Sequence, residues 1–142
     1  MAEMTLFPWT DTPASFKDAR RRFRAALYHE RAEMFYRPEL RYVAVCDICD
    51  YPLLDAFDMH EVIITRGDVS KRHQQHLIFA KYNCVLLHPI CHQRHGHSTD
   101  FDVRLVGKLV ERYGQDSIEE WLRSLPFRTT PRSLSQWIDQ AG

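Results

Sequence analysis

The amino-acid sequence predicts a mixed α+β fold in which a small strand–strand–helix core lies between helical flanks. Apolar residues recur at helical spacing near both ends of the 142-residue chain. The middle of the chain instead alternates short apolar, β-branched segments with turns. The stretch from Asn83 to His97 holds two of the four cysteines and four of the eight histidines. We therefore expect the fold to be organised around this central stretch.

The length favours a single domain of residues 1–142, large enough to bury a core. We divide it into an N-terminal arm and helix (1–40), a central core (41–100) and C-terminal helices (101–142). No apolar run is long enough to span a bilayer, and the start lacks the basic and apolar regions of a signal peptide. We expect a cytoplasmic protein with no membrane partner. Cysteines stay reduced in that compartment, which favours metal ligands or buried thiols over disulfides.

Charge is unevenly distributed, although the formal net charge is zero. Residues 14–41 hold eight Lys/Arg against four Asp/Glu, and residues 47–61 hold five carboxylates without a Lys or Arg. Residues 64–97 then hold five Lys/Arg, one Asp and six of the histidines. Two basic segments around an acidic one are compatible with flanks that contact phosphate and a centre that holds a cation.

The first helix is expected to run from a Thr12-Pro13 cap to about Phe35. One stripe of this helix is apolar, comprising Phe16, Ala19, Phe23, Ala26, Leu27 and Met34. Its other faces carry Arg20, Arg21, Arg22 and Arg24. A solvated surface is the simpler interpretation of these arginines. Phosphate contact becomes attractive only if the centre of the chain handles nucleic acid.

The central segment is predicted to begin with a short strand at Arg41–Val45, which leads into a Cys-x₂-Cys knuckle and a turn at Asp50-Tyr51-Pro52. Residues 53–64 should contain a second short strand that ends in an apolar run. Residues 65–82 lack a strong period and are interpreted as a basic loop with about one helical turn. A strand at Cys84–Leu87, a knuckle at His88–Cys91 and a helix from His92 complete the core.

Two to three helices are predicted in the C-terminal part. An apolar stripe marks the first helix, which Gly114 should stop: Val103, Val106, Leu109, Val110 and Tyr113. A capping signal at residues 116–119 starts the second helix, with Ile118, Trp121, Leu122 and Leu125 facing inward. A further capping box at residues 133–136 starts a short last helix.

Two ligand pairs separated by 38 residues predict a structural zinc site. They are Cys46-x₂-Cys49 and His88-x₂-Cys91. Zinc takes four nitrogen or sulfur ligands in a tetrahedron, and a two-residue gap lets both side chains of a pair reach one ion. The remaining cysteine, Cys84, lies on a predicted strand and is interpreted as a small buried residue.

The order Cys-x₂-Cys, His-Glu-Val-Ile, Asn-x₄-His-x₂-Cys-His resembles the HNH endonucleases of the ββα-metal (His-Me finger) group, particularly small phage-type members. The resemblance covers about residues 44–98, which is less than half of the chain. The commoner zinc pattern of that family has cysteine at the position of His88, and histidine is also a competent zinc ligand. The flanking helices lie outside the resemblance.

The resemblance implies hydrolysis of DNA phosphodiester bonds with one catalytic divalent metal, which could be Mg²⁺, Mn²⁺, Ni²⁺ or Zn²⁺. It assigns the catalytic positions to His60, Glu61, Asn83 and His92. It assigns the catalytic metal ligands to His60, His92 and a further histidine about one turn beyond His92. His95 and His97 are the candidates for that position, and we select His97. A phage-encoded member would act in the host cytoplasm.

The role of His60 stays open at the sequence level. The family has a metal ligand followed at once by the general base, whereas this chain has Asp58-Met59-His60-Glu61. If His60 is the ligand, Glu61 occupies the position of the base. If His60 is the base, Met59 occupies the ligand position, and a thioether is a poor ligand for Mg²⁺ or Mn²⁺. Asp58 could then substitute, because it shares a strand face with His60.

Contacts with the DNA backbone are expected from Arg66, Lys71, Arg72 and Arg94. Such contacts position a duplex without reading its sequence. The alternative function is a non-catalytic, zinc-stabilised nucleic-acid-binding module, and a zinc-scaffolded protein adaptor is a third. The sequence does not predict the oligomeric state.

Overall fold

The computed structural model describes residue 9 and residues 11–34, 43–95 and 99–127, without the side chains of Met34, His95 and Thr99. It contains both helices and a small antiparallel sheet, which confirms the mixed α+β class. The elements follow in the order α2 (Phe16–Met34), β1 (Asp58–Glu61), η1 (Arg66–Asp68), η2 (Arg72–Ile78), β2 (Cys84–Leu87), α3 (Pro89–His95), α4 (Thr99–Tyr113) and α5 (Gln115–Ser124). No helix in the described ranges combines the length and apolar character needed to cross a membrane.

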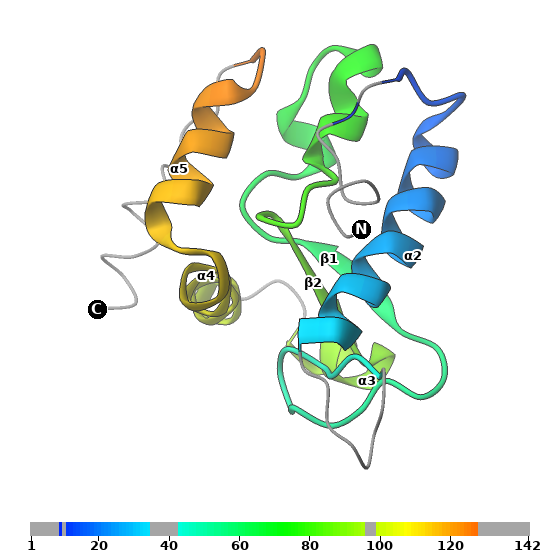
Figure 1. Cartoon of the computed structure of the whole chain (residues 1–142), viewed down its shortest axis with the longest axis vertical. Helices are drawn as coiled ribbons and strands as arrows, with labels where there is room; N and C mark the ends of the chain where they lie inside the picture. Colours follow the sequence, from blue (N-terminus) through cyan, green and yellow to red (C-terminus); the bar gives the residue numbers. More distant parts are fainter. Residues whose placement is uncertain (1–8, 10, 35–42, 96–98, 128–142) are drawn as a thin grey trace.

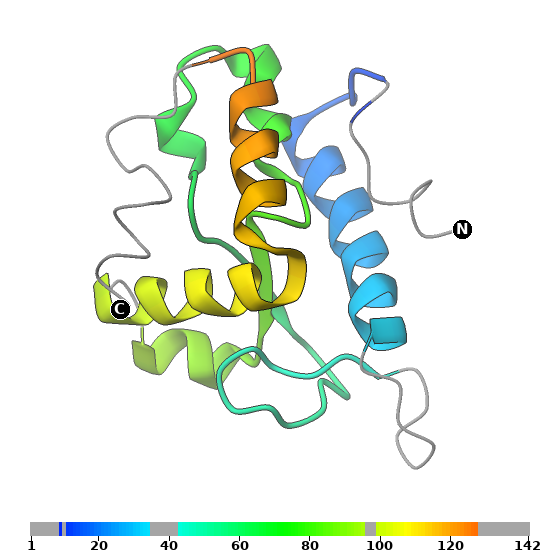
Figure 2. The ribbon, with the colours of Figure 1, turned by 60° about the vertical axis from the view of Figure 1, so that its left-hand side comes forward.

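The sheet lies in the middle of the molecule. Strand β1 pairs antiparallel with β2, and His60 lies opposite Val85 in the register. Helix α2 runs along one side of the sheet, while α4 and α5 lie on the other side (Figure 1). Turned by 60°, the structure shows α4 lying next to α3, and α5 continuing from the end of α4 in a different direction (Figure 2).

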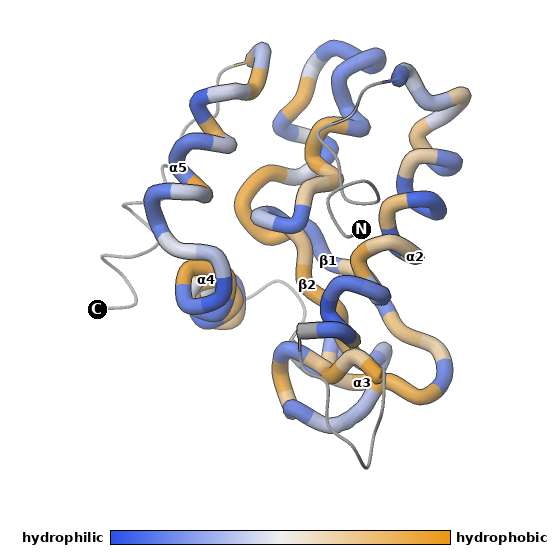
Figure 3. Tube along the Cα trace, viewed as in Figure 1, coloured by the Kyte–Doolittle hydropathy of each residue, from blue (hydrophilic) through white to orange (hydrophobic). Residues whose placement is uncertain are grey.

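The core gathers where α2, the sheet and α4 meet. Strand β2 is buried at all four positions, as a strand covered on both faces should be. The hydropathy colouring is apolar along β2 and alternates along α2, which turns only one stripe inward (Figure 3). That stripe contributes fully buried Ala19, Phe23 and Leu27. The ring of Phe23 stacks on Phe79 with centroids 6.2 Å apart.

Helix α2 begins later than its sequence suggests. The backbone N–H of Asp18 donates to Ser15 Oγ at 3.0 Å, so Ser15 caps the helix and the predicted Thr12-Pro13 cap is wrong. The first N–H groups of a helix have no acceptor within the helix, and the Ser15 hydroxyl accepts the one of Asp18. The predicted end at Phe35 lies outside the described residues.

Both predictions for the chain before β2 overestimated the strand content of the residues that the structure describes. Within Arg41–Val45, the described part makes only an isolated bridge between Val45 and Pro52, because the knuckle folds the chain straight back. The second strand is limited to Asp58–Glu61. The apolar run Val62–Ile64 is buried but leaves the sheet, since the Asn83 side chain takes the backbone N–H groups of Ile63 and Ile64. The loop at 65–82 contains two 3₁₀ segments, η1 and η2, rather than one turn.

Two helix starts also differ from prediction. Helix α3 begins at Pro89 instead of His92, because proline suits the first helical position and the His92 N–H bonds to the His88 carbonyl at 3.0 Å. Gly114 ends α4 as predicted, with φ of 89°. It also directly precedes α5, which starts at Gln115 without the side-chain cap expected at residues 116–119. The predicted last helix lies outside the described residues.

Candidate metal centre and histidine cluster

The four predicted zinc ligands come together. One ligand atom from each of Cys46, Cys49, His88 and Cys91 lies within 4.8 Å of all the others. Among the described residues, this is the only group of three or more metal-ligating side chains that meets so closely. The prediction of a four-residue site that could hold a metal such as zinc is therefore confirmed.

Local backbone geometry produces the first knuckle. Asp50 adopts a left-handed conformation with φ of 64°, and its N–H bonds to the Cys46 carbonyl at 3.0 Å. The backbone N–H groups of Ile48 and His88 point at Cys46 Sγ, at 3.4 and 3.5 Å. Burial raises the pKa of the Cys46 thiol. These two backbone hydrogen bonds, and one from the backbone of Cys49, outweigh burial and bring the pKa below its ordinary value. The thiolate, which is the form that binds metal, is thereby favoured.

The second knuckle comprises His88, which directly precedes α3, and Cys91 in the first turn of that helix. His88 Nε2–H donates to the Pro52 carbonyl at 3.0 Å, which leaves Nδ1 as the lone-pair nitrogen. Nδ1 lies 3.2 Å from Cys49 Sγ and 4.0 Å from Cys91 Sγ. Ligands of a tetrahedral zinc with ordinary bond lengths are separated by about 3.6 Å from nitrogen to sulfur. The donor set and its spacing fit zinc.

The pKa of the Cys91 thiol reflects its burial and the sulfur atoms around it. Burial raises its pKa to about 12, and the neighbouring sulfurs of Cys49 and Cys46 add to the effect. Several thiolates this close repel one another unless a cation lies between them. A bound metal cation removes that penalty and deprotonates a coordinating thiol.

The fourth cysteine, Cys84, is separate from this group. It is fully buried, as predicted for a core residue, and its thiol donates a hydrogen bond to the Ile78 carbonyl at 3.7 Å.

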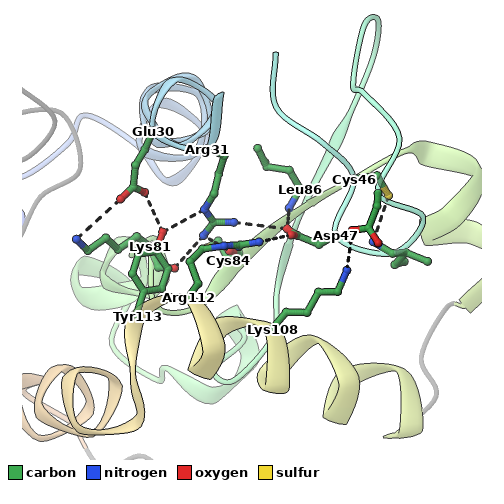
Figure 4. Close-up of polar contacts among 12 residues, drawn as sticks. Glu30, Arg31, Cys46, Asp47, Lys81, Cys84, Leu86, Lys108, Arg112 and Tyr113 are labelled. Atoms are coloured by element: carbon green, nitrogen blue, oxygen red, sulfur yellow. Dashed lines mark hydrogen bonds and ion pairs between the residues drawn. The ribbon is translucent and has the colours of Figure 1, made fainter. Parts of the chain in front are cut away.

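A buried ion-pair network anchors the first knuckle to the helices (Figure 4). Asp47 accepts from Arg112 of α4 at 2.7 Å and pairs with Arg31 of α2 at 3.5 Å. The carboxylate oxygen that faces Arg31 also accepts the N–H of Leu86 in β2 at 3.0 Å. One carboxylate therefore ties the residue next to Cys46 to two helices and the sheet.

Arg31 extends the same network on the other side. Its guanidinium donates to the carbonyls of Cys84 and Lys81, at 2.9 and 3.1 Å, and to the Tyr113 hydroxyl at 3.1 Å. The hydroxyl of Tyr113 in turn donates to Glu30 at 2.9 Å. Burial of Tyr113 raises its pKa to about 12. The contacts fix the end of α2 against the start of β2.

A second cluster forms where β1 faces α3. The rings of His60 and His92 have centroids 5.1 Å apart. Asp58 Oδ2 lies 3.0 Å from His92 Nδ1, and Asp102 Oδ1 lies 3.0 Å from His60 Nε2. Each imidazole therefore has its own carboxylate partner. The pair of Asp58 and His92 is the more accessible, with 42% and 31% of their side-chain surfaces exposed, against 18% for His60 and Asp102.

Glu61 and Asn83, the other two predicted catalytic residues, lie elsewhere. Strand alternation puts Glu61 on the face of buried Met59, opposite to the face of His60. Asn83 is fully buried, and its amide makes four hydrogen bonds of 2.8–2.9 Å to the backbone of Ile63, Ile64 and Ile78. Asn83 can act on the cluster only by holding the chain that follows β1.

The remaining predicted residues lie around this core. His97, the predicted third ligand of the catalytic metal, is outside the described residues. Lys71, Arg72 and Arg94 are exposed. Arg66 is also exposed, but its guanidinium lies 4.1 Å above the Phe16 ring and its Nε donates to Gln75 at 3.1 Å. Their assignment to DNA contact stays a prediction.

Comparison with known proteins adds no relative: no protein-family model matches this chain, and neither the curated proteins nor the solved structures contain a significant match.

Sequence reasoning missed Asp102 and the Arg31–Asp47–Arg112 network. Asp102 lies in the first turn of α4, where an acidic residue is ordinary helix chemistry. Arg31 lies on an amphipathic helix, where an arginine is usually solvated. No local spacing marks either residue as a partner for a group 42 or 16 positions away.

Proposed function

We propose that this protein is a metal-dependent endonuclease of the HNH (ββα-metal) type, with a structural zinc held by Cys46, Cys49, His88 and Cys91, that hydrolyses DNA phosphodiester bonds. The observation that carries the proposal is the meeting of His60 on β1 with His92 on α3, 5.1 Å apart, each with its own carboxylate. The strand–strand–helix order around them supports the same assignment.

Asp58 and His92 suit the role of ligands to the catalytic divalent metal. Their facing oxygen and nitrogen atoms are 3.0 Å apart. Neighbouring ligands of an octahedral ion with bonds of about 2.1 Å are also separated by about 3.0 Å. Met59, the residue at the family's ligand position, points into the core with 1% exposure. Asp58 therefore replaces it, and His60 is free for proton transfer.

His60 suits the role of general base. Its Nε2–H is donated to Asp102, which fixes the tautomer and leaves the lone pair on Nδ1. An imidazole in that state can accept a proton from water near neutral pH. The resulting hydroxide would attack phosphorus while the bond from phosphorus to the leaving oxygen breaks. When bound, the divalent metal supplies charge neutralisation on the phosphate and stabilises the leaving oxygen.

Cleavage of supercoiled plasmid tests the proposal, with Mg²⁺, Mn²⁺, Ni²⁺ and Zn²⁺ added separately to protein already loaded with structural zinc. His60→Ala and His92→Ala should each lower the rate by about 100-fold or more. His29→Ala is the matched control, because this histidine is exposed on α2 and outside the cluster. Plasmid that stays intact with every metal, or full activity of His60→Ala, contradicts the enzyme assignment.

One observation favours the alternative, a zinc-stabilised DNA-binding module without catalysis. Within the described part of the chain, Asp58 and His92 bring only two ligand atoms to the catalytic position. Counting metal ions per chain separates the two functions. The nuclease should bind Mn²⁺ in addition to one zinc, and Asp58→Asn should abolish the second binding event. A binding module would retain DNA affinity but hold the zinc alone.

A further inference from the structure

The first half of α2 carries a basic face that the zinc and histidine sites do not use. Lys17, Arg20, Arg21 and Arg24 follow the spacing i, i+3, i+4, i+7, so they share one side of the helix. Together with Ser15 and Asp18, they line an open hollow of about 440 Å³. Four cations against one carboxylate give this hollow a net charge of 4 − 1 = +3.

Two of these arginines are held against the free edge of the sheet. Arg20 donates to the Met59 carbonyl at 2.9 Å, and Arg24 donates to the Phe57 carbonyl. These carbonyls belong to the residues immediately before and after Asp58, on the edge of β1 that β2 does not cover. The arginines thus satisfy an exposed strand edge. A guanidinium has five N–H donors, so a carbonyl contact leaves others for an anion.

The other two cations face solvent. Lys17 is exposed, and Arg21 has 80% of its side-chain surface exposed. Arg21 pairs with Asp18 at 2.8 Å, but an exposed pair of this kind contributes little to stability and exchanges readily for another anion. These two side chains are therefore available to a ligand without loss to the fold.

The spacing of the cations fits an extended polyanion better than a single small anion. Seven residues of helix span about 10 Å. Duplex DNA carries about one negative charge per 1.7 Å of its axis, so several phosphates lie within that distance. We propose that the hollow on α2 binds the phosphate backbone of duplex DNA beside β1. This surface is distinct from the basic loop at residues 65–82, and the inference rests on the proposed function in taking DNA as the substrate.

Fluorescence anisotropy with a labelled duplex of about 20 base pairs tests the inference, over a series of salt concentrations and without a catalytic metal. Lys17→Gln/Arg21→Gln leaves the two edge-capping arginines in place. It should weaken binding and reduce the magnitude of the slope of log K against log salt by about 2, or about 1 for each lost phosphate contact. Arg21→Gln alone should reduce it by about 1. Arg123→Gln, which removes an exposed arginine on α5, should leave the slope unchanged.

Three results overturn the inference: no DNA binding by the wild-type protein, an unchanged slope in the double variant, or an equal loss in Arg123→Gln. Plasmid cleavage in parallel separates this inference from the nuclease assignment. Weakened binding by the double variant with no cleavage by the wild type supports the hollow and contradicts the nuclease. Cleavage by the wild type, with the same KM and slope in the double variant, supports the nuclease and contradicts the hollow.

Discussion

Replacing Asp47 by asparagine tests whether the buried ion-pair network holds the first knuckle, Cys46 to Cys49, against the helices. Asp47 is 3% exposed, and its carboxylate faces two nearly buried guanidiniums, those of Arg31 and Arg112. Asparagine keeps the size of the side chain and an oxygen that can accept the Leu86 N–H. The substitution therefore removes the negative charge and leaves the packing nearly unchanged.

The expected loss in the free energy of unfolding is about 3–5 kcal/mol. Removing one partner of a buried ion pair costs that amount because the opposite charge stays buried without compensation. The 2.7 Å contact between Arg112 and Asp47 is the shorter of the two and should account for most of the loss. Asp47→Ala should cost about 1–3 kcal/mol more, since the Leu86 N–H then loses its acceptor as well. These losses are large against a total stability of about 5–15 kcal/mol.

Asp50→Asn is the matched control. Asp50 is also next to a cysteine ligand and also pairs with a cation on α4, Lys108 at 3.1 Å, but it is 73% exposed. Asparagine tolerates its left-handed backbone, so the variant should lose less than about 1 kcal/mol. Urea unfolding of the zinc-loaded proteins measures both changes. Equal losses in Asp47→Asn and Asp50→Asn would refute the reasoning from burial.

Three further predictions follow from single contacts. His88→Ala should abolish stoichiometric zinc binding and lower the unfolding midpoint, and chelation of the wild type should lower that midpoint too. Cys84→Ala should keep one zinc per chain, which metal analysis after gel filtration measures. Asp102→Asn should lower kcat for DNA cleavage by about 10- to 100-fold with little change in KM, because His60 loses the carboxylate that fixes its tautomer. The control Asp100→Asn, at an exposed position, should change neither constant. Asn83→Ala should destabilise the protein by about 3–5 kcal/mol in urea, since several buried backbone groups lose their partner; a loss under about 1 kcal/mol would contradict its role in holding the chain.

The features that the sequence predicted correctly depend on short spacing. The Cys-x₂-Cys and His-x₂-Cys pairs each meet because a two-residue gap fixes their geometry locally. Strand Cys84–Leu87 was predicted with its correct bounds, since four consecutive apolar residues between polar ends leave little choice. The stop at Gly114 followed from its freedom to adopt positive φ.

The features that the sequence did not predict depend on distant partners. Several polar groups can cap a helix, and only packing decides that Ser15 is used in α2. Asp102 and His60 are 42 residues apart, and helical periodicity says nothing about which polar side chain meets another element. The length of β1 was overestimated because the apolar run after it is buried through Asn83 rather than through strand pairing.

The four-residue metal group (Cys46, Cys49, His88 and Cys91) and the histidine cluster share one short helix, so their geometries are coupled. Helix α3 has seven residues, too few to be stable alone. Cys91 of its first turn and His88, the residue just before the helix, belong to the metal group. His92 follows directly and faces Asp58 across to β1. A metal that binds the first turn therefore also fixes the direction of His92. We expect loss of the proposed zinc to disperse the histidine cluster even when a catalytic metal is supplied in excess.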